Sequence, residues 1–282
     1  MATFTAKDVQ ELRQRTGAGM MDCKKALEEN SGDMQAATDY LRKKGIAKAE
    51  KRAGKSTSEG VVLAETNGQG GVLVEVNCET DFVARNEDFQ AMARQVARHA
   101  LATPSATDAE SLLHSTMPNG QTVDTFVKEG SAKMGEAVQV RRVARLEGTV
   151  GKYVHFNGKL GALVGVQGSD AEEAQNLAAV IAEHVAAQGP VSVDETSIPE
   201  EVVARERAIA EERTRAEGKP EAMIAKIVDG KMKAFYKEVA LLHQAWVREP
   251  KQSIAQVVAD VTKKVGTPIT VTRFVRFQLG QE

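Results

Sequence analysis

The sequence predicts an α+β protein: an N-terminal three-helix module, a core of two related α+β subdomains with antiparallel sheets, and an inserted antiparallel helical hairpin. Three observations support this. Capping and glycine signals divide the first 45 residues into three helices, residues 59–76 resemble residues 147–166, and two charged helical segments follow one another within 199–237. A duplicated strand-turn-strand-helix unit interrupted by a helical insertion indicates an α+β class.

Length and composition describe an ordinary globular chain. It has 282 residues, of which 42% are hydrophobic and 27% charged, and its net charge of −2 argues against a dedicated nucleic-acid binder. Two cysteines in a chain of this size favour a reducing compartment. Neither a signal peptide nor an apolar run of about 20 residues is visible, so we expect a cytoplasmic protein with no membrane contact.

The N-terminal segment carries the signals of three short helices. Thr5 and Asp8 resemble a capping box, and Gly17 ends the first helix after Thr16. The second helix runs to Asn30, Asp33 caps the third, and Gly45 is expected to close it. The charged stretch 48–60 is then expected to be a linker.

An internal repeat forms the predicted core. "EGVVLAETNGQGGVLVEV" (59–76) and "EGTVGKYVHFNGKLGALVGV" (147–166) each contain two strands joined by an Asn-Gly turn. A helix follows each copy, with apolar residues at three- and four-residue spacing, and His99 aligns with His184. The inward strand positions are expected to be Val72, Val74, Val76, Ala162, Val164 and Val166. The inward helix positions are Phe89, Met92, Ala93, Val96, Ala97 and Ala100, and Leu177, Val180, Ile181, His184 and Val185.

The first copy is longer than the second by five residues, which lie in or beside "CETDFVARNED" (78–88). Because the second copy closes without them, the insertion is expected to be either a loop with a purpose of its own or a tolerated accident. It places Phe82 among polar residues, directly after Asp81. A large apolar ring in such a loop is either tucked into the core or held out for a partner.

The inserted hairpin is predicted from proline and glycine punctuation. Pro199 and Pro220 precede two helices, and Gly218 lies at the break between them. The first helix is heavily charged, so we expect a protruding arm with one narrow packed face. That face is expected to comprise Val202, Val203, Ala208 and Ile209. The prediction is completed by a helix near Leu112, another from Val123 to Met134, a strand within 137–148, a helix capped by Ser253 and a last strand, "ITVTRFVRFQL". The expected domains are 1–55, the module and linker; 56–146, the first subdomain; 147–189 with 237–282, the second subdomain; and 190–236, the hairpin.

The usual catalytic and metal-binding motifs are missing from the sequence. It contains no phosphate-binding loop, dinucleotide fingerprint, His-Glu-x-x-His, paired Cys-x-x-Cys or nucleophile elbow. Cys78 with His99 or His155 as base is the one alternative for nucleophilic catalysis. A cysteine at a strand end is more often a small buried hydrophobe, and His99 and His184 are expected to pack on their helices. We therefore expect no covalent chemistry, no cofactor and no metal.

A basic run offers a second alternative function. It lies within 42–55 and would serve an RNA-binding or ribosome-associated protein. Aromatic residues that would stack on bases are missing from it, so a solvated helix end and linker is the simpler interpretation, and direct nucleic-acid binding is not expected. Its cations are Arg42, Lys43, Lys44, Lys48, Lys51, Arg52 and Lys55.

Two long motifs carry a resemblance to a known family. "LRQRTGAGMMDCKKAL" (12–27) and "EVNCETDFVA" (75–84) closely resemble the signature motifs of the elongation factor Ts family. Members are bacterial guanine-nucleotide exchange factors that act on elongation factor Tu, and the resemblance extends over nearly the whole chain. It implies the same architecture, with an N-terminal module similar to the ubiquitin-associated fold.

The resemblance also implies which residues contact the partner. In the family, the phenylalanine of the Thr-Asp-Phe-Val loop enters between two helices of the GTPase near its magnesium and phosphate site, which gives Phe82 the role of a wedge. Arg13, Met20 and Met21 match the part of the module that docks beside it, and at least one of the two methionines is expected to be exposed. The remaining positions implied are Thr80, Asp81, Val83, Met134, Gly135, His155 and Val247.

Two departures from the family pattern stand out. Longer members continue past the last strand into a helix that packs on the partner, and that contact is expected to be missing here. Arg248 stands where an apolar residue is common in the family, beside Val247.

Overall fold

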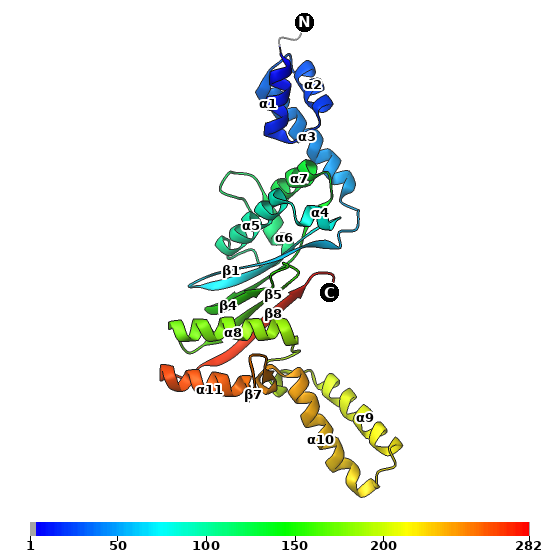
Figure 1. The fold of residues 1–282 in the computed structure, drawn as a ribbon, viewed down its shortest axis with the longest axis vertical. Helices are drawn as coiled ribbons and strands as arrows, with labels where there is room; N and C mark the ends of the chain where they lie inside the picture. The colour runs from blue at the N-terminus through cyan, green and yellow to red at the C-terminus, as the bar shows by residue number, and fades with distance from the viewer. Residues whose placement is uncertain (1–3, 282) are drawn as a thin grey trace. The chain divides into compact units, whose positions relative to one another are not determined.

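The structure, a computed structural model, describes residues 4–281 and has the mixed helix-and-strand fold that the sequence predicts (Figure 1). The chain forms two compact units. The first comprises the chain up to Leu63, Val74–Ala144 and the chain from Gln278 onward. The second comprises Ala64–Leu73 and Arg145–Phe277.

The N-terminal module consists of α1 (Ala6–Thr16), α2 (Met20–Glu29) and α3 (Met34–Arg52). The predicted caps are present: Thr5 and Asp8 form the capping box, and the Asp33 carboxylate accepts the Ala36 N–H at 2.8 Å. Gly17 ends α1 with φ 69°, a left-handed conformation that favours glycine. The small core of the module comprises Val9, Leu12, Cys23, Ala26, Leu27, Ala37 and Leu41.

The expected end of the third helix at Gly45 is wrong, because α3 continues to Arg52. A Cβ at Gly45 would come within 2.9 Å of Ala132 on the helix α7 (Val123–Met134). The glycine therefore allows two helices to approach closely and does not terminate its own helix. As a result, residues 48–52 of the expected linker 48–60 are helical.

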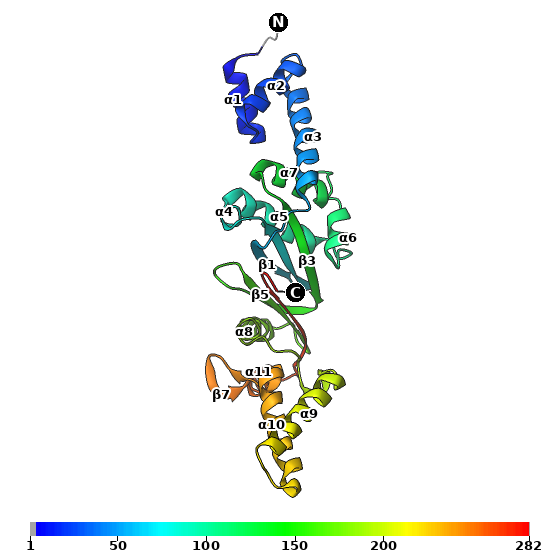
Figure 2. The ribbon, with the colours of Figure 1, turned by 90° about the vertical axis from the view of Figure 1, so that its right-hand side faces the viewer.

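A three-stranded sheet with helices follows the N-terminal module, and the strand residues 64–67, 70–73 and 145–147 are counted in the second unit. The strands are β1 (Glu59–Asn67), β2 (Gly70–Cys78) and β3 (Val138–Glu147), in the order β1-β2-β3. The helices are α4 (Asp81–Ala84), α5 (Glu87–Ala102), α6 (Ala109–His114) and α7 (Figure 2). All six predicted inward residues of α5 are buried. Strand β2 is buried on both faces, and its Glu75 is paired with Arg142 of β3 at 2.7 Å.

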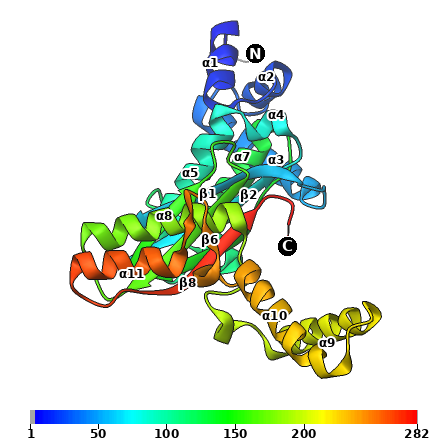
Figure 3. The same ribbon diagram turned by 60° about the horizontal axis from the view of Figure 1, so that its bottom comes forward.

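The second unit repeats the plan. Strands β4 (Thr149–Val154) and β5 (Leu160–Gln167) are antiparallel, with Thr149 opposite Val166, and β8 (Thr270–Gln278) lies beside β5. Helices α8 (Glu172–Gln188) and α11 (Ile254–Val265) lie side by side next to this sheet (Figure 3). Of the predicted inward residues of α8, all are buried except Val180, which is half-buried.

The helical hairpin consists of α9 (Glu200–Ala216) and α10 (Glu221–Val239), preceded by the short turn η1 (Glu195–Ser197). The predicted packed face is partly wrong, because Val202 and Ala208 are exposed. Val203 lies on the inner side as predicted, and Ala210 and Thr214 join it at spacings of seven and four residues. Their partners on α10 include Ile224, Val228 and Met232.

After the hairpin the chain forms η2 (Leu241–His243) and a small two-stranded hairpin, β6 (Ala245–Trp246) and β7 (Glu249–Ser253). The sequence analysis did not predict these strands. Ser253 caps α11 as expected. Within residues 4–281, no helix combines the length and apolar character that crossing a membrane requires.

Candidate functional site

The inserted loop after β2 forms a single helical turn, α4, that is capped at both ends. The Thr80 hydroxyl accepts the Val83 N–H at 3.4 Å, and the Gln90 side chain donates to the Ala84 carbonyl at 2.6 Å. Ala84 is buried and anchors the turn. Polar side chains flanking the turn thus satisfy its backbone groups, so its conformation does not depend on burying the rest of it.

Phe82 projects from this turn into solvent. It is 83% exposed. Asp81 pairs instead with Arg85 at 3.1 Å, along the turn, and leaves the ring uncovered. Of the two positions that the sequence left open for this ring, the structure shows the exposed one and not burial in the core. An exposed aromatic side chain on a rigid support has the properties of a binding anchor.

The structure brings the second predicted segment, Met134 and Gly135, next to the base of this loop. The residue that follows them, Glu136, accepts hydrogen bonds from the N–H of Thr80 at 3.0 Å and from its hydroxyl at 2.6 Å. Met134 is half-buried and Gly135 is exposed. The Thr80–Val83 and 134–135 segments, far apart in sequence, therefore form one surface of the first unit.

Arg13, Met20 and Met21 lie at the α1–α2 corner of the N-terminal module. Arg13 is in the last turn of α1, and the two methionines open α2 after Gly19. Met20 is 46% exposed and Met21 75% exposed. Both methionines are thus outside the small core, which agrees with the expectation that at least one of them is exposed.

His155 lies at the turn between β4 and β5, in the second unit. Its ring nitrogen Nδ1 is 3.0 Å from the Tyr153 hydroxyl, and its ring centroid is 4.5 Å from that of Phe156. The Phe156 side chain is 93% exposed. The sequence analysis did not select it, although an aromatic residue directly before an Asn-Gly turn is the signal that could have found it.

Val247 lies in the connection between β6 and β7, on a different hairpin from His155. Its backbone N–H donates to Nδ1 of His184 at 3.3 Å. The next residue, Arg248, pairs with Glu183 of α8. Adjacent residues of α8 thus hold both positions, and the charged side chain of Arg248 is directed to a partner within its own chain.

The alternative nucleophile Cys78 is in an unfavourable environment for catalysis. Its side chain is buried, and burial, followed by the nearby Glu136 carboxylate, raises the pKa of the thiol to about 12. A thiolate nucleophile requires a shift in the opposite direction. His99 contacts Ser115 at 2.9 Å and not Cys78, so the structure does not assemble this pair.

Several cations of the basic segment 42–55 are already paired with acidic side chains. Arg42 pairs with Glu129, Lys44 with Asp22 at 2.9 Å, and Arg52 with Glu79 at 3.1 Å. These pairs hold α3 against its neighbours. They also reduce the positive charge that the segment offers to a polyanion.

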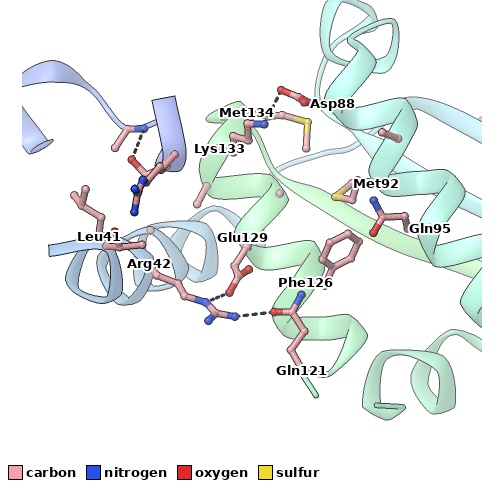
Figure 4. Close-up of a pocket in the computed structure, with 18 of the residues that line it drawn as sticks. Leu41, Arg42, Asp88, Met92, Gln95, Gln121, Phe126, Glu129, Lys133 and Met134 are labelled. Atoms are coloured by element: carbon pink, nitrogen blue, oxygen red, sulfur yellow. Dashed lines mark hydrogen bonds and ion pairs between the residues drawn. The ribbon is translucent and has the colours of Figure 1, made fainter. Parts of the chain in front are cut away.

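A cavity of about 630 Å³ lies in the first unit between α1 and α3 on one side and α5 and α7 on the other. Figure 4 shows its apolar side chains, including Met92, Phe126 and Met134, and the contacts of Arg42 with Gln121 and Glu129. Lys133 at its edge pairs with Asp88 at 2.8 Å. Arg15, the third cation of the lining, pairs with Glu11. All three cations therefore have partners, so the lining does not favour an anionic ligand.

Comparison with known proteins places this chain in the class of translation elongation factors. The curated relatives of this chain include proteins called elongation factor Ts from Nitrobacter hamburgensis and Rhodopseudomonas palustris strain BisA53, each 46% identical over 290 residues. Another, from Sphingopyxis alaskensis, is 48% identical over 290 residues. Each comparison covers 100% of this chain and 94% of the relative.

The family follows from these relatives and from a second match. The family model described as Elongation factor TS matches residues 79–281, from the base of the Phe82 loop to the end of the described chain. The chain therefore belongs to the elongation factor Ts family, as its two sequence motifs indicate. It is a translation elongation factor of protein biosynthesis.

Proposed function

We propose that this protein is a guanine-nucleotide exchange factor that binds elongation factor Tu with GDP bound and promotes GDP release. The observation that carries the proposal is the 83% exposed Phe82 on a capped helical turn beside Met134 and Gly135. The ring enters between two helices of the GTPase and disturbs its magnesium and phosphate site. No covalent bond is made or broken, and the factor itself binds neither nucleotide nor metal.

The energetics of such a factor are those of coupled binding. A protein that binds the nucleotide-free partner more tightly than the nucleotide-bound partner must weaken nucleotide binding by the same factor. Accelerating release about a thousandfold requires roughly 4 kcal/mol of differential interaction. Burying one Phe side chain supplies roughly 1.5–3 kcal/mol. Phe82 therefore contributes a large share, and contacts at the other predicted positions supply the remainder.

The other predicted contact residues orient the wedge. Arg13, Met20 and Met21 dock the N-terminal module beside the GTPase domain. His155 faces another domain of the partner, and Val247 makes an apolar contact. These positions lie on different elements, so an interface that includes all of them contacts the partner at several points. Binding energy at remote points then fixes the geometry in which Phe82 acts.

The test is release of fluorescent GDP from purified elongation factor Tu, with and without this protein. We expect strong acceleration by the wild type and a loss of at least about tenfold with Phe82→Ala, in line with the burial energy of one Phe. Met223→Ala, which alters a half-exposed apolar side chain on α10, serves as the matched control and should behave as the wild type. Unchanged release with Phe82→Ala would reject the wedge, and no acceleration by the wild type would reject the exchange function.

A further inference from the structure

The Phe82 loop and the connection between α7 and β3 hold each other through two glutamates. Glu79 accepts the backbone N–H of Ala137 at 2.6 Å, and Glu136 accepts the backbone N–H of Thr80 at 3.0 Å. Each carboxylate thus binds the N–H of the residue that follows the other glutamate. We call this pair of reciprocal contacts, made by residues 79–80 and 136–137, the glutamate clasp.

Within the clasp, the Thr80 hydroxyl connects Glu136 to the helical turn that carries Phe82. It donates to Glu136 Oε1 at 2.6 Å and accepts from the Val83 N–H at 3.4 Å. A carboxylate only accepts hydrogen bonds, so it fixes the direction of the hydroxyl proton and leaves a lone pair for Val83. The chain of contacts from Glu136 through Thr80 to Val83 therefore sets the start of α4, two residues before Phe82.

The Glu136 side of the clasp rests on a rigid connection. Gly135 ends α7 with φ 72°, and its N–H donates to the Ser131 carbonyl at 2.9 Å. The Ser131 hydroxyl, which is buried, donates to the Glu136 carbonyl. The backbone of Glu136 is thus fixed independently of the contact that its side chain makes with Thr80.

The Glu79 side is also held by a cation. Arg52, at the end of α3, donates to both oxygens of Glu79 at 3.2 and 3.3 Å. The Ala137 N–H first, and Arg52 with it, hold the pKa of Glu79 below its ordinary value, so the carboxylate remains charged. The clasp is therefore attached to the helix that leads out of the N-terminal module.

We propose that Glu136 is a positioning residue for the exchange reaction: it acts through Thr80 to fix the direction in which Phe82 leaves the first unit. This inference rests on the proposed function and assigns to Glu136 a role of its own. Holding the ring in one orientation before binding removes the cost of ordering it in the complex. A loop with the same residues but without the clasp would carry the wedge in many orientations.

The test combines Glu136→Gln with Thr80→Val, which removes the hydroxyl and keeps the backbone N–H. A glutamine presents only one acceptor oxygen to two donors. We expect each variant to lower the maximal GDP-release rate about tenfold, and the double variant to be no slower than the slower single variant, because both remove the same contact. Glu110→Gln, which alters an exposed glutamate on α6, is the matched control and should match the wild type.

Two further measurements separate positioning from a general loss of structure. In a Phe82→Ala background, Glu136→Gln should change the release rate less than twofold, whereas a general structural role would multiply the two losses. Amide hydrogen exchange in the free factor should become faster at Thr80 and Val83 and stay unchanged in α8. A wild-type rate for Glu136→Gln, or multiplied losses, would overturn the proposal. If the wild type does not accelerate release at all, the exchange function fails, and hydrogen exchange at Val83 still decides whether the clasp holds the turn.

Discussion

His184 and Val247 are joined by a hydrogen bond in which the backbone N–H of Val247 donates to the imidazole Nδ1 at 3.3 Å. The other ring nitrogen, Nε2, lies 2.9 Å from Gln244 Oε1, and the Gln244 amide donates to the Glu238 carbonyl at 2.7 Å. The ring is therefore neutral, with its proton on Nε2, and is completely buried. It fixes the hairpin that carries Val247 to α8, beside the pair formed by Glu183 and Arg248.

This buried histidine predicts a pH dependence of stability. Burial lowers the pKa of His184 from its ordinary value of 6.5, and burial lowers that of His99 as well. The unfolded chain binds protons below about pH 6.5 that the folded chain does not bind, so the free energy of unfolding is highest above that pH and falls as the pH is lowered. The loss is at most about 1.4 kcal/mol per pH unit for each histidine. Urea unfolding from pH 8 to pH 5 should show this slope, and it should be smaller in His184→Gln; equal slopes would contradict the assignment.

Much of the fold could be predicted because local signals and tertiary structure agree. The capping boxes, the Asn-Gly turns and the duplicated unit each specify an element on their own. Gly45 and Val202 show where such signals fail. Gly45 carries the local signal of a helix end, but its role is the close approach of α3 to Ala132, a contact 87 positions along the chain. The inner face of α9 depends on which of several apolar residues α10 covers, and periodicity alone does not decide this.

The candidate site, like the fold, could be predicted from the sequence only in part. The five additional residues in the first repeat locate the Phe82 loop from the sequence alone, because a comparison of two copies exposes an insertion. Glu136 and His184 carry no such local signal for a positioning role. Each acts on a segment that is more than 50 positions away in sequence, through a contact that only the fold creates. Phe156 does carry a local signal, an aromatic residue at a turn, although the sequence analysis did not select it.

At Gly151 we expect the addition of a single methyl group to lower the stability of the fold. It lies on β4 where α8 crosses, and a Cβ there would come within 2.0 Å of the Ala178 carbonyl carbon, a backbone atom that cannot move aside. We expect Gly151→Ala to lower the free energy of unfolding by about 1–3 kcal/mol. Gly68→Ala is the matched control, since nothing lies within 4 Å of its Cβ position, and should change stability by less than about 0.5 kcal/mol. Equal urea midpoints for the two variants would show that the contact is relaxed in solution.

We expect both cysteine thiols to react slowly with thiol reagents in the folded protein. Cys23 and Cys78 are both buried, and the pKa of Cys78 is raised to about 12. At pH 8 its reactive thiolate is therefore only about one part in ten thousand. Ellman's reagent should label neither thiol rapidly in the native protein and both in urea. Rapid labelling of Cys78 in the native state would restore the nucleophile alternative.

If the protein acts on elongation factor Tu as proposed, we expect the exposed Phe156 to be a second contact with that partner, separate from Phe82. Its 93% exposed ring sits on a tight turn, where the His155 N–H donates to the Leu160 carbonyl and the Gly158 N–H to the His155 carbonyl, both at 2.8 Å. Covering such a ring is worth roughly 1.5–3 kcal/mol, so Phe156→Ser should weaken binding of nucleotide-free elongation factor Tu by about ten- to a hundredfold. At saturating factor the maximal GDP-release rate should remain that of the wild type, because Phe82 is intact. Calorimetric titration gives the affinity, with Val191→Ala, a change at another exposed apolar residue, as control. An unaltered affinity would show that the ring faces solvent in the complex too, and a lowered maximal rate would assign it to the release step instead.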